Sequence, residues 1–467
     1  MKITFVANQF FFFRHIDPIA SDLVKRGHQV SFWFGNLEKS NITDRAVSLF
    51  IESHSDLASF RRLPKHIRGK FRYLHRVVRE LLGYHTYLVP GFTSSNKKQV
   101  FESHMSAVSK WLVNIPIARR MLRNQRIYLA LRKFLAAIPV DFEIMAELQE
   151  EKPDILVAVT NLREDINAPE LEYIKAALRL GIKAVDLVAS WDNLSTKSTF
   201  NVIPDGIILW NQFMLEEAVE LHRVPAEKII VSGAETFDYL FDIRTSSSHS
   251  EFCKKIGFNE DKPFVVYLGS SSSMTGDETE FVREFVKILR TELSIDTLIR
   301  PHPLNAAIWN DFEEPGAVIW PRNGELPDTS QTQTDLWDTF HHSSAVIGIN
   351  TSAMIEAAIV DRPCVTIRSS QYSASQSETG HFRHLLNGGF LEIADDFDQA
   401  VCIIRNIMNG EDRLSDKRRD FVFKFIRPNG INQPVGTLIA QSLELLVGDK
   451  STFNNKAIVN TIDYLHS

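Results

Sequence analysis

The sequence predicts an α/β protein with two consecutive domains, each a parallel sheet with helices on both faces. Short apolar runs rich in Val, Ile and Phe alternate with amphipathic stretches along most of the chain. The alternation breaks at a polar run, Arg244–Lys255, and then starts again. The 467 residues are enough for about two or three domains. Because strand–helix alternation is typical of doubly wound sheets, we expect two Rossmann-like domains that face each other across a cleft.

The first domain, residues 1–243, is expected to open with a strand, a helix and a second strand. The apolar run Lys2–Ala7 predicts the first strand, and Gly27 ends the helix predicted at Asp17–Arg26. Further strands are predicted at His28–Phe34, Asp154–Val159, Lys183–Ser190, Gly206–Trp210 and Lys228–Gly233, and further helices at Pro169–Leu180 and Phe213–Leu221.

Residues 56–137 interrupt this rhythm with a long, basic, helix-prone insertion. Arg61–Lys133 holds 17 Lys and Arg against two acids, Glu80 and Glu102, a local balance of +15. Basic residues interleaved with Phe, Tyr, Leu and Val, as in Phe60–Leu81, are typical of a helix that lies on anionic lipid. We therefore expect residues 60–133 to contact an anionic membrane surface. A polyanionic acceptor and a solvated helix face are the alternatives.

The second domain, residues 256–433, repeats the pattern and leads into a C-terminal helix and tail, 434–467. Its strands are predicted at Phe264–Gly269, Thr297–Arg300, Ala317–Trp320, Ala345–Asn350 and Cys364–Ile367. Its helices are predicted at Asp277–Leu293, Thr351–Val360 and Phe397–Met408, and Pro434–Val447 is the last helix of the chain.

Composition and charge exclude several classes of protein. The net charge of −6 argues against a nucleic-acid binder, so no nucleic acid is expected as a partner. Three widely spaced cysteines predict neither a disulfide framework nor a zinc cluster, which fits a reducing, cytoplasmic location. No window of about 18 apolar residues predicts a transmembrane helix. Asp396 and Asp398 match a bare metal-binding pattern, but their place before a helix favours capping, so we expect no metal and no cofactor.

Two loops in the second domain are suited to an anion. Gly269, Ser270, Ser271 and Ser272 form a small-residue turn whose N–H groups can make an anion nest. Thr275 and Glu278 are then spaced as a capping box, and the absence of Gly-Lys-Ser/Thr excludes a P-loop. Asn350, Thr351 and Ser352 stand at a helix start, where hydroxyls and N–H groups favour phosphate, and Glu356 one turn on is placed for ribose hydroxyls.

A third segment, Leu-Ile-Arg-Pro-His-Pro, holds Arg300 and His302 on a stiff backbone at a strand end. Taken singly, these segments are also explained as a polar turn, an N-cap and a stiff surface turn. Because the carboxyl ends of parallel strands meet at one edge, the three together predict a bound nucleotide monophosphate or diphosphate. His381 and Arg383 lie in a loop that we expect either to close over the donor head group or to be an ordinary loop.

In the first domain, acids and a histidine follow the strands. Asp192, flanked by Trp191 and an amide, is the preferred general base for deprotonating an acceptor hydroxyl. Glu164, Asp165 and His15 are the other candidates for this catalytic role. Turn formation, helix capping and pairing with a neighbouring cation are the structural alternatives for all four.

Together these motifs resemble bacterial GT-B glycosyltransferases. The whole pattern is most similar to the branch that holds polyglycerol-phosphate transferases and CMP-sugar-dependent capsule transferases. Uncharacterised bacterial proteins of the same superfamily are resembled by Ser190–Ser198, Leu209–Asp238 and Phe425–Pro434, and the resemblance covers most of the chain except the basic insertion. It implies that 1–243 binds the acceptor, that 256–433 binds the donor, and that the last helix packs back on the first domain. It further implies that His302, Thr351 and Ser352 contact donor phosphate, and that catalysis needs no metal.

We expect a cytoplasmic glycosyltransferase, peripheral on the inner face of the membrane. It would move a sugar from a CMP-, CDP- or UDP-linked donor to a glycan or lipid-linked acceptor in the synthesis of a capsule, lipopolysaccharide or other cell-surface polysaccharide. A glycerol- or ribitol-phosphate transferase and a hydrolysing UDP-sugar 2-epimerase are the alternatives within the same fold. A nucleotide-binding scaffold of a capsule assembly complex is the non-catalytic alternative.

Overall fold

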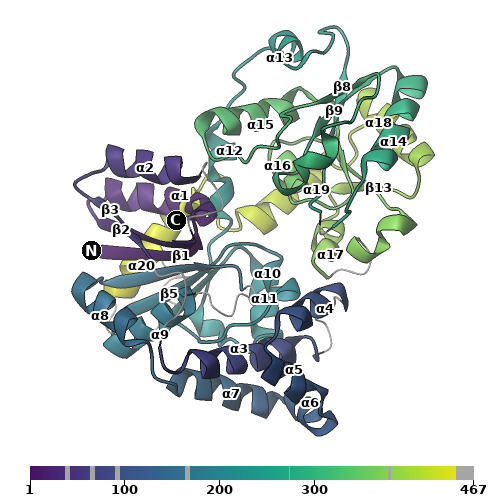
Figure 1. Ribbon diagram of the computed structural model, residues 1–467. Helices are drawn as coiled ribbons and strands as arrows, with labels where there is room; N and C mark the ends of the chain where they lie inside the picture. The colour runs from purple at the N-terminus through teal and green to yellow at the C-terminus, as the bar shows by residue number, and fades with distance from the viewer. Residues whose placement is uncertain are drawn as a thin grey trace. The chain divides into compact units, whose positions relative to one another are not determined.

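The computed structural model describes residues 1–36, 43–63, 69–89, 95–162, 169–272, 274–376 and 380–448. It divides into two compact units (Figure 1). Unit 1 is Met1–Asp238 with Phe425–Ser467, and unit 2 is Tyr239–Lys424. Each unit is built on one sheet in which every strand pair of the described residues is parallel, so the expected α/β class with two Rossmann-like domains is confirmed.

The sheet of unit 1 has seven strands in the order β3-β2-β1-β4-β5-β6-β7. Its strands are β1 (Lys2–Gln9), β2 (Gln29–Asn36), β3 (Ala58–Arg62), β4 (Ile155–Thr160), β5 (Lys183–Val188), β6 (Gly206–Leu209) and β7 (Ile229–Val231). The order reverses between β1 and β4, which makes this the switch point of the sheet. The sequence pattern does not predict β3, because its Phe-Arg-Arg end carries the charge typical of an exposed sheet edge.

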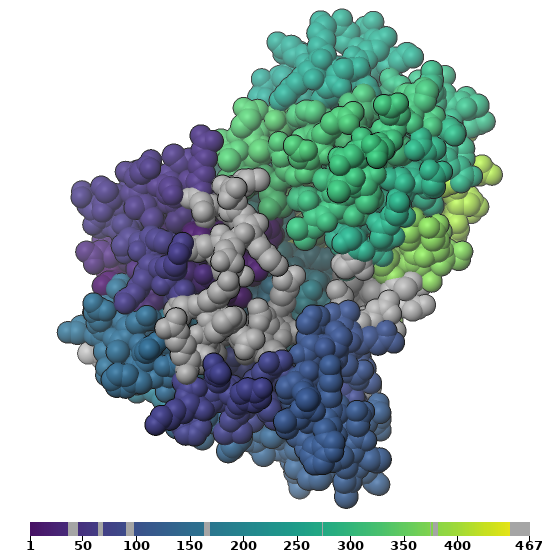
Figure 2. Space-filling view, in the orientation of Figure 1, coloured from purple at the N-terminus to yellow at the C-terminus, as the bar shows by residue number. Residues whose placement is uncertain are grey.

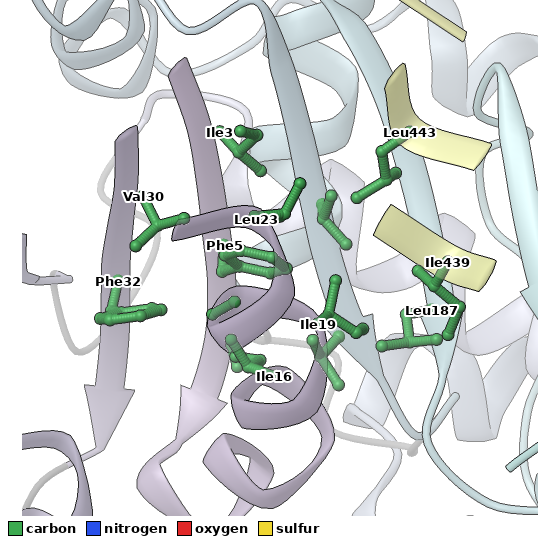
Figure 3. Packing of buried hydrophobic residues seen from close by; sticks show 14 of the residues in the cluster. Ile3, Phe5, Ile16, Ile19, Leu23, Val30, Phe32, Leu187, Ile439 and Leu443 are labelled. Atoms are coloured by element: carbon green, nitrogen blue, oxygen red, sulfur yellow. The ribbon is translucent and has the colours of Figure 1, made fainter. Parts of the chain in front are cut away.

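Helices from both ends of the chain cover one face of this sheet. In Figure 3, α1 (Phe13–Lys25) and α20 (Val435–Gly448) direct Ile19, Leu23, Ile439 and Leu443 at the apolar side chains of the strands. A Cβ added to Gly436 would lie 2.6 Å from the backbone oxygen of Pro18, so the two helices pack in close contact. The other helices of the sheet region are α2 (Thr43–Ser53), α9 (Glu170–Leu180), α10 (Asn193–Thr196) and α11 (Gln212–Glu220), with α12 (Asp238–Asp242) at the unit boundary.

The basic insertion folds as a helical subdomain of unit 1. It contains α3 (Arg72–Thr86), α4 (Ser95–His104), α5 (Ala107–Asn114), α6 (Pro116–Leu122) and α7 (Gln125–Ala137), and α8 (Phe142–Glu151) follows it before β4. Arg79 on α3 is 2 % exposed and forms an ion pair with the fully buried Glu172 on α9. Phe60–Leu81 is therefore not one membrane-facing helix, since it joins the end of β3 to α3 and one of its arginines is used inside the fold.

The sheet of unit 2 has six strands in the order β10-β9-β8-β11-β12-β13, with the reversal between β8 and β11. Its strands are β8 (Phe264–Leu268), β9 (Asp296–Arg300), β10 (Ala317–Ile319), β11 (Val346–Gly348), β12 (Cys364–Ile367) and β13 (Leu391–Ala394). Its helices are α13 (His249–Ile256), α14 (Thr279–Leu293), α15 (Ser330–His342), α16 (Ala353–Ile359), α17 (Gly380–Asn387), α18 (Phe397–Met408) and α19 (Ser415–Phe421). Asp396 accepts a hydrogen bond from the N–H of Gln399, which confirms its predicted role as the cap of α18.

In the described ranges, no helix is long and apolar enough to cross a bilayer. Within the same residues, no group of three or more His, Cys, Asp or Glu side chains is arranged to hold a metal ion.

Candidate functional site

The three anion-suited segments follow three adjacent strands of unit 2. The serine turn follows β8, Arg300 ends β9, and Asn350 comes two residues after β11. Since β9, β8 and β11 are neighbours and parallel, these segments share the carboxyl edge of the sheet at its switch point. This is the place where doubly wound sheets bind ligands.

The turn after β8 is packed directly on the end of β9. The N–H of Gly269 donates to the carbonyl of Arg300 at 2.9 Å, and an added Cβ would stand 3.2 Å from the backbone nitrogen of His302. Asn305 holds the same turn, because its Nδ2 donates to the carbonyls of Ser270 at 3.2 Å and Gly276 at 3.0 Å. No sequence motif identifies Asn305 as a residue of the site. It holds the turn only once the turn after β8 has folded over it.

Glu278 is not part of a capping box, so that interpretation of Thr275 and Glu278 is wrong. The helix α14 begins at Thr279, and the side chain of Glu278, a residue 1 % exposed, points back to the turn. It accepts hydrogen bonds from the N–H of Ser270 at 2.7 Å and from the hydroxyl of Tyr267 at 2.9 Å. Burial raises the pKa of Glu278 to about 7. One N–H of the expected anion nest is therefore already occupied by a carboxyl group.

Arg300 is a buried cation with an unmade hydrogen bond. It is 6 % exposed, and its guanidinium carbon lies 5.9 Å from the ring centroid of Trp320. Its Nη1 is buried and has no hydrogen-bond partner in the described part of the chain. Burial lowers the pKa of Arg300, and the charge of Glu356 acts against that shift. A buried donor left unsatisfied costs stability, so its presence at a ligand-binding edge favours an anionic ligand.

His302 offers a hydrogen-bond donor here and not a positive charge. Its Nδ1 accepts the backbone N–H of Leu304 at 3.1 Å and so caps the short helix Pro303–Trp309. Burial lowers the pKa of His302, so the imidazole is neutral near pH 7. A neutral ring that accepts at Nδ1 carries its proton at Nε2, which leaves Nε2–H as a donor.

The remaining donor candidates differ in what their side chains already contact. Buried Asn350 donates through Nδ2 to the carbonyl of Ser375, and the hydroxyl of Thr351 accepts the N–H of Ala353 at 3.4 Å. Ser352 and Ser272 are exposed, and the carbonyl of Ser271 accepts the N–H of Met274 at 2.9 Å.

Two further expectations concern Glu356 and the loop of His381 and Arg383. The carboxylate of Glu356 accepts from the hydroxyl of Tyr239 at 3.3 Å. The expected loop is in fact the helix α17, in which Arg383 is exposed, while the His381 side chain lies outside the described residues.

In unit 1, the contacts of Asp192 are those of a turn residue. Its oxygens accept from the hydroxyls of Ser190 at 2.6 Å and Thr196 at 3.3 Å, and Lys197 lies 3.8 Å away. These contacts hold the carboxylate within the turn. Glu164 and Asp165 lie outside the described residues.

His15 is buried in unit 1 and pairs with an acid distant in sequence. It is 1 % exposed, and its Nδ1 lies 2.7 Å from Oε1 of the fully buried Glu235. Burial holds the pKa of His15 well below its usual value and raises the pKa of Glu235 to about 8. The pair of His15 and Glu235 therefore shares one proton and has no net charge near pH 7. Because His15 is buried, an acceptor hydroxyl cannot reach it.

A polar cavity of about 70 Å³ lies at the switch point of unit 1. Its walls come from the end of β1, the end of β4, the start of α9 and the segment after α10. The lining residues are Asn8, Gln9, Phe12, Thr160, Asn161, Leu162, Glu170, Leu171, Thr199 and Asn201. None of them was a candidate from the sequence, because amides and threonines after strands carry no distinctive signal.

Comparisons with known proteins show likeness in structure alone. No protein-family model and no curated protein matches the sequence. The chain is similar in structure to a UDP-GlcNAc 2-epimerase from Methanocaldococcus jannaschii, with a TM-score of 0.54 and 12% identity over 95% of this chain and 100% of that one. It is also similar to MnaA of S. aureus, solved with UDP, at a TM-score of 0.54 and 11% identity over 97% and 99% of the two chains.

A glycosyltransferase from Rickettsia africae gives a TM-score of 0.50 and 11% identity over 97% of this chain and 99% of that chain. Identities this low establish the fold and leave activity open. The described strand orders, the two parallel sheets and these matches together show that the chain has the GT-B fold.

Proposed function

We propose that the protein is a glycosyltransferase that takes its sugar from a nucleotide-activated donor bound at the carboxyl edge of the sheet in unit 2. The observation that carries this proposal is Arg300, a buried guanidinium with an unsatisfied Nη1 at the switch point of a doubly wound sheet. The same fold in a protein solved with UDP supports a nucleoside diphosphate as the bound group.

The proposed reaction is attack of an acceptor hydroxyl on the anomeric carbon of the donor sugar. A bond forms between that carbon and the acceptor oxygen, the bond to the phosphate oxygen breaks, and the proton leaves with a general base. Arg300, the Nε2–H of His302 and the hydroxyls of Thr351 and Ser352 would stabilise the negative charge that grows on the leaving phosphate. Asp192 remains our proposed base, together with Glu164 and Asp165 of the loop after β4.

One experiment separates transfer from epimerisation. Epimerisation at C2 must break the C2–H bond, so in D₂O an epimerase would exchange that proton of UDP-N-acetylglucosamine for deuterium. We expect no exchange by proton NMR, and we expect nucleotide release from a panel of UDP-, CMP- and GDP-sugars only when a glycan and lipid extract is added. Deuterium at C2 would favour the epimerase. Tight nucleotide binding without turnover in any mixture would favour the scaffold.

We also propose that α5 and α6 of the insertion bind an anionic membrane, where lipid-linked acceptors reside. Trp111, Ile117 and Met121 are 65 %, 69 % and 52 % exposed, although apolar side chains of this size are usually covered. Ile117 and Met121 lie one turn apart on α6, and Arg119 and Arg120 are exposed beside them. In Figure 2 the blue residues of the insertion lie at the molecular surface.

Vesicle sedimentation tests this surface. We expect binding to vesicles that contain phosphatidylglycerol and little binding to pure phosphatidylcholine, with loss of binding in Trp111→Ser/Ile117→Ser. Phe142→Ser is the matched control, since Phe142 is 83 % exposed but begins the acidic helix α8. Equal binding to both lipids, or equal loss in the control, would remove the membrane proposal.

A further inference from the structure

The polar cavity of unit 1 has a composition that selects one class of ligand. Four of its lining side chains are amides, from Asn8, Gln9, Asn161 and Asn201, and two are threonine hydroxyls. Among the lining residues that the structure describes, Glu170, which is 5 % exposed, is the one ionisable group, and none of these residues is a cation. Amide and hydroxyl groups both donate and accept hydrogen bonds, as sugar hydroxyls do.

One lining residue, Asn201, has a buried acceptor atom without a donor among the described residues. Asn201 is 5 % exposed, and its Oδ1 is buried without a hydrogen-bond partner anywhere in the described ranges. A buried acceptor left in this state costs stability. A ligand hydroxyl in the cavity would remove that cost, whereas a phosphate or carboxylate oxygen has no proton to donate.

The surroundings of the cavity also indicate a binding site. It lies between the ends of β1 and β4, where the strand order reverses, which is the usual ligand position in such a sheet. Leu162 in its wall has a φ of +47°, a left-handed conformation that a leucine adopts only when its surroundings impose it. Thr199 in the opposite wall is fixed by contacts of its Oγ1 with the hydroxyl of Tyr128 at 2.7 Å and with Nδ1 of His222 at 2.9 Å.

From the cavity's lining, burial and position we propose that it binds an uncharged polyhydroxy group, such as the edge of one sugar ring, with Asn201 and Glu170 accepting hydrogen bonds from its hydroxyls. The cavity disfavours phosphorylated and carboxylated rings, because its described lining residues include a carboxyl group and no cation to pair with an anion. A volume of about 70 Å³ has room for several water-sized groups and so for part of a ring. The inference rests on the proposed function only in naming this ring as part of the acceptor. It predicts a neutral acceptor rather than a glycerol-phosphate or other anionic one.

Ligand-observed NMR on the full chain tests the proposal without any nucleotide. The probes are the methyl glycosides of glucose, galactose, mannose and N-acetylglucosamine, each paired with its 6-phosphate or its uronate. At a typical affinity per atom, a ligand of this size binds with a Kd of about 1 mM. We expect at least one neutral glycoside to bind and its anionic counterpart to bind at least about tenfold more weakly. No binding by any neutral glycoside, or equal binding of an anionic counterpart, would overturn the proposal.

Two variants locate the binding in this cavity. Asn201→Leu removes the acceptor while keeping the volume, so we expect glycoside binding to be lost while the melting temperature is unchanged or higher. Asn114→Leu, the same change at an exposed position on α5, should leave binding unchanged. Glu170→Gln should narrow the preference for the neutral glycoside over its anionic counterpart. Full binding in Asn201→Leu, or an unchanged preference in Glu170→Gln, would contradict the assignment. These binding results do not depend on unit 2, so they test the cavity even if unit 2 binds no nucleotide.

Discussion

Replacing Arg300 with methionine should stabilise the protein without ligand and weaken nucleotide binding. The substitution removes a buried donor whose lost hydrogen bond costs about 1–3 kcal/mol. It also removes the attraction between the guanidinium and the ring of Trp320, 5.9 Å away, which is worth about 0.5–2 kcal/mol. Methionine keeps most of the apolar stem, so we expect the free energy of unfolding to change by about −1 to +2.5 kcal/mol, a small gain at the centre of this range.

The effect on binding has the opposite sign and is larger. A hydrogen bond from a charged donor contributes about 1.5–3 kcal/mol, and its loss should raise the Kd for the best-binding nucleoside diphosphate by about 10- to 150-fold. Arg300→Lys keeps the charge without the planar fork, so its Kd should lie between those of the wild type and Arg300→Met. An arginine that only supports the fold would not combine an increase in stability without ligand with a loss of nucleotide affinity on the same substitution.

Urea unfolding without ligand and calorimetric titration with the nucleotide measure both quantities on the same preparations. Arg322→Met is the matched control, because Arg322 is exposed in unit 2 and should change neither value by much. A fall of several kcal/mol in stability would show that Arg300 is a structural residue. Unchanged nucleotide affinity in Arg300→Met would refute its assignment to the phosphate site.

Three further predictions concern the fold around the two sites. Burial raises the pKa of Glu278 from its usual value of about 4.5 to about 7 in the folded chain, so its contribution to stability is full below about pH 4.5 and is lost as pH rises through 7. Glu278→Gln should abolish a loss of about 3 kcal/mol between pH 5 and pH 9 in urea unfolding, and an unchanged pH profile would contradict this. Glu172→Gln should cost about 3–5 kcal/mol, because Arg79 stays buried without its counter-charge, and a cost below 1 kcal/mol would be inconsistent with the burial of Arg79. Gly436→Ala should cost about 1–3 kcal/mol by overpacking, while Gly448→Ala on the same helix meets open space and should cost nothing. Equal melting temperatures for these two variants would argue against the close contact of α20 with α1.

The α/β architecture is predictable because each central strand is an uninterrupted apolar run. The helix predicted at Phe397–Met408 has the bounds of α18, since Asp396 caps one end and the amphipathic pattern continues to the other. The strand β3 and the helix α15 are not predictable in the same way. The first is a short, charged edge strand, and the second begins in the polar run Ser-Gln-Thr-Gln-Thr.

The sites are predictable only as far as strand order follows from the sequence. The turn at Gly269, the strand end at Arg300 and the helix start at Asn350 meet because β8, β9 and β11 are neighbours. The partner of Ser270 is not predictable, because Glu278 fits a local capping pattern and folds back to the turn. The cavity of unit 1 could not be predicted from the sequence. Asn201 becomes a lining residue only because segments distant in the sequence end at the same edge of the sheet.

A thermal-shift measurement with CMP, CDP, UDP, GDP and dTDP tests the central claim most directly. A ligand at 100 times its Kd adds about 2.7 kcal/mol to stability, a readily measured rise in melting temperature. The donor-site assignment predicts that at least one of these nucleotides raises the melting temperature of the wild type and raises that of Arg300→Met clearly less at the same concentration, because a 10- to 150-fold weaker Kd leaves only about 0.3–1.4 kcal/mol of stabilisation. A wild-type melting temperature unchanged by all five nucleotides, or a shift of equal size in Arg300→Met, would contradict it.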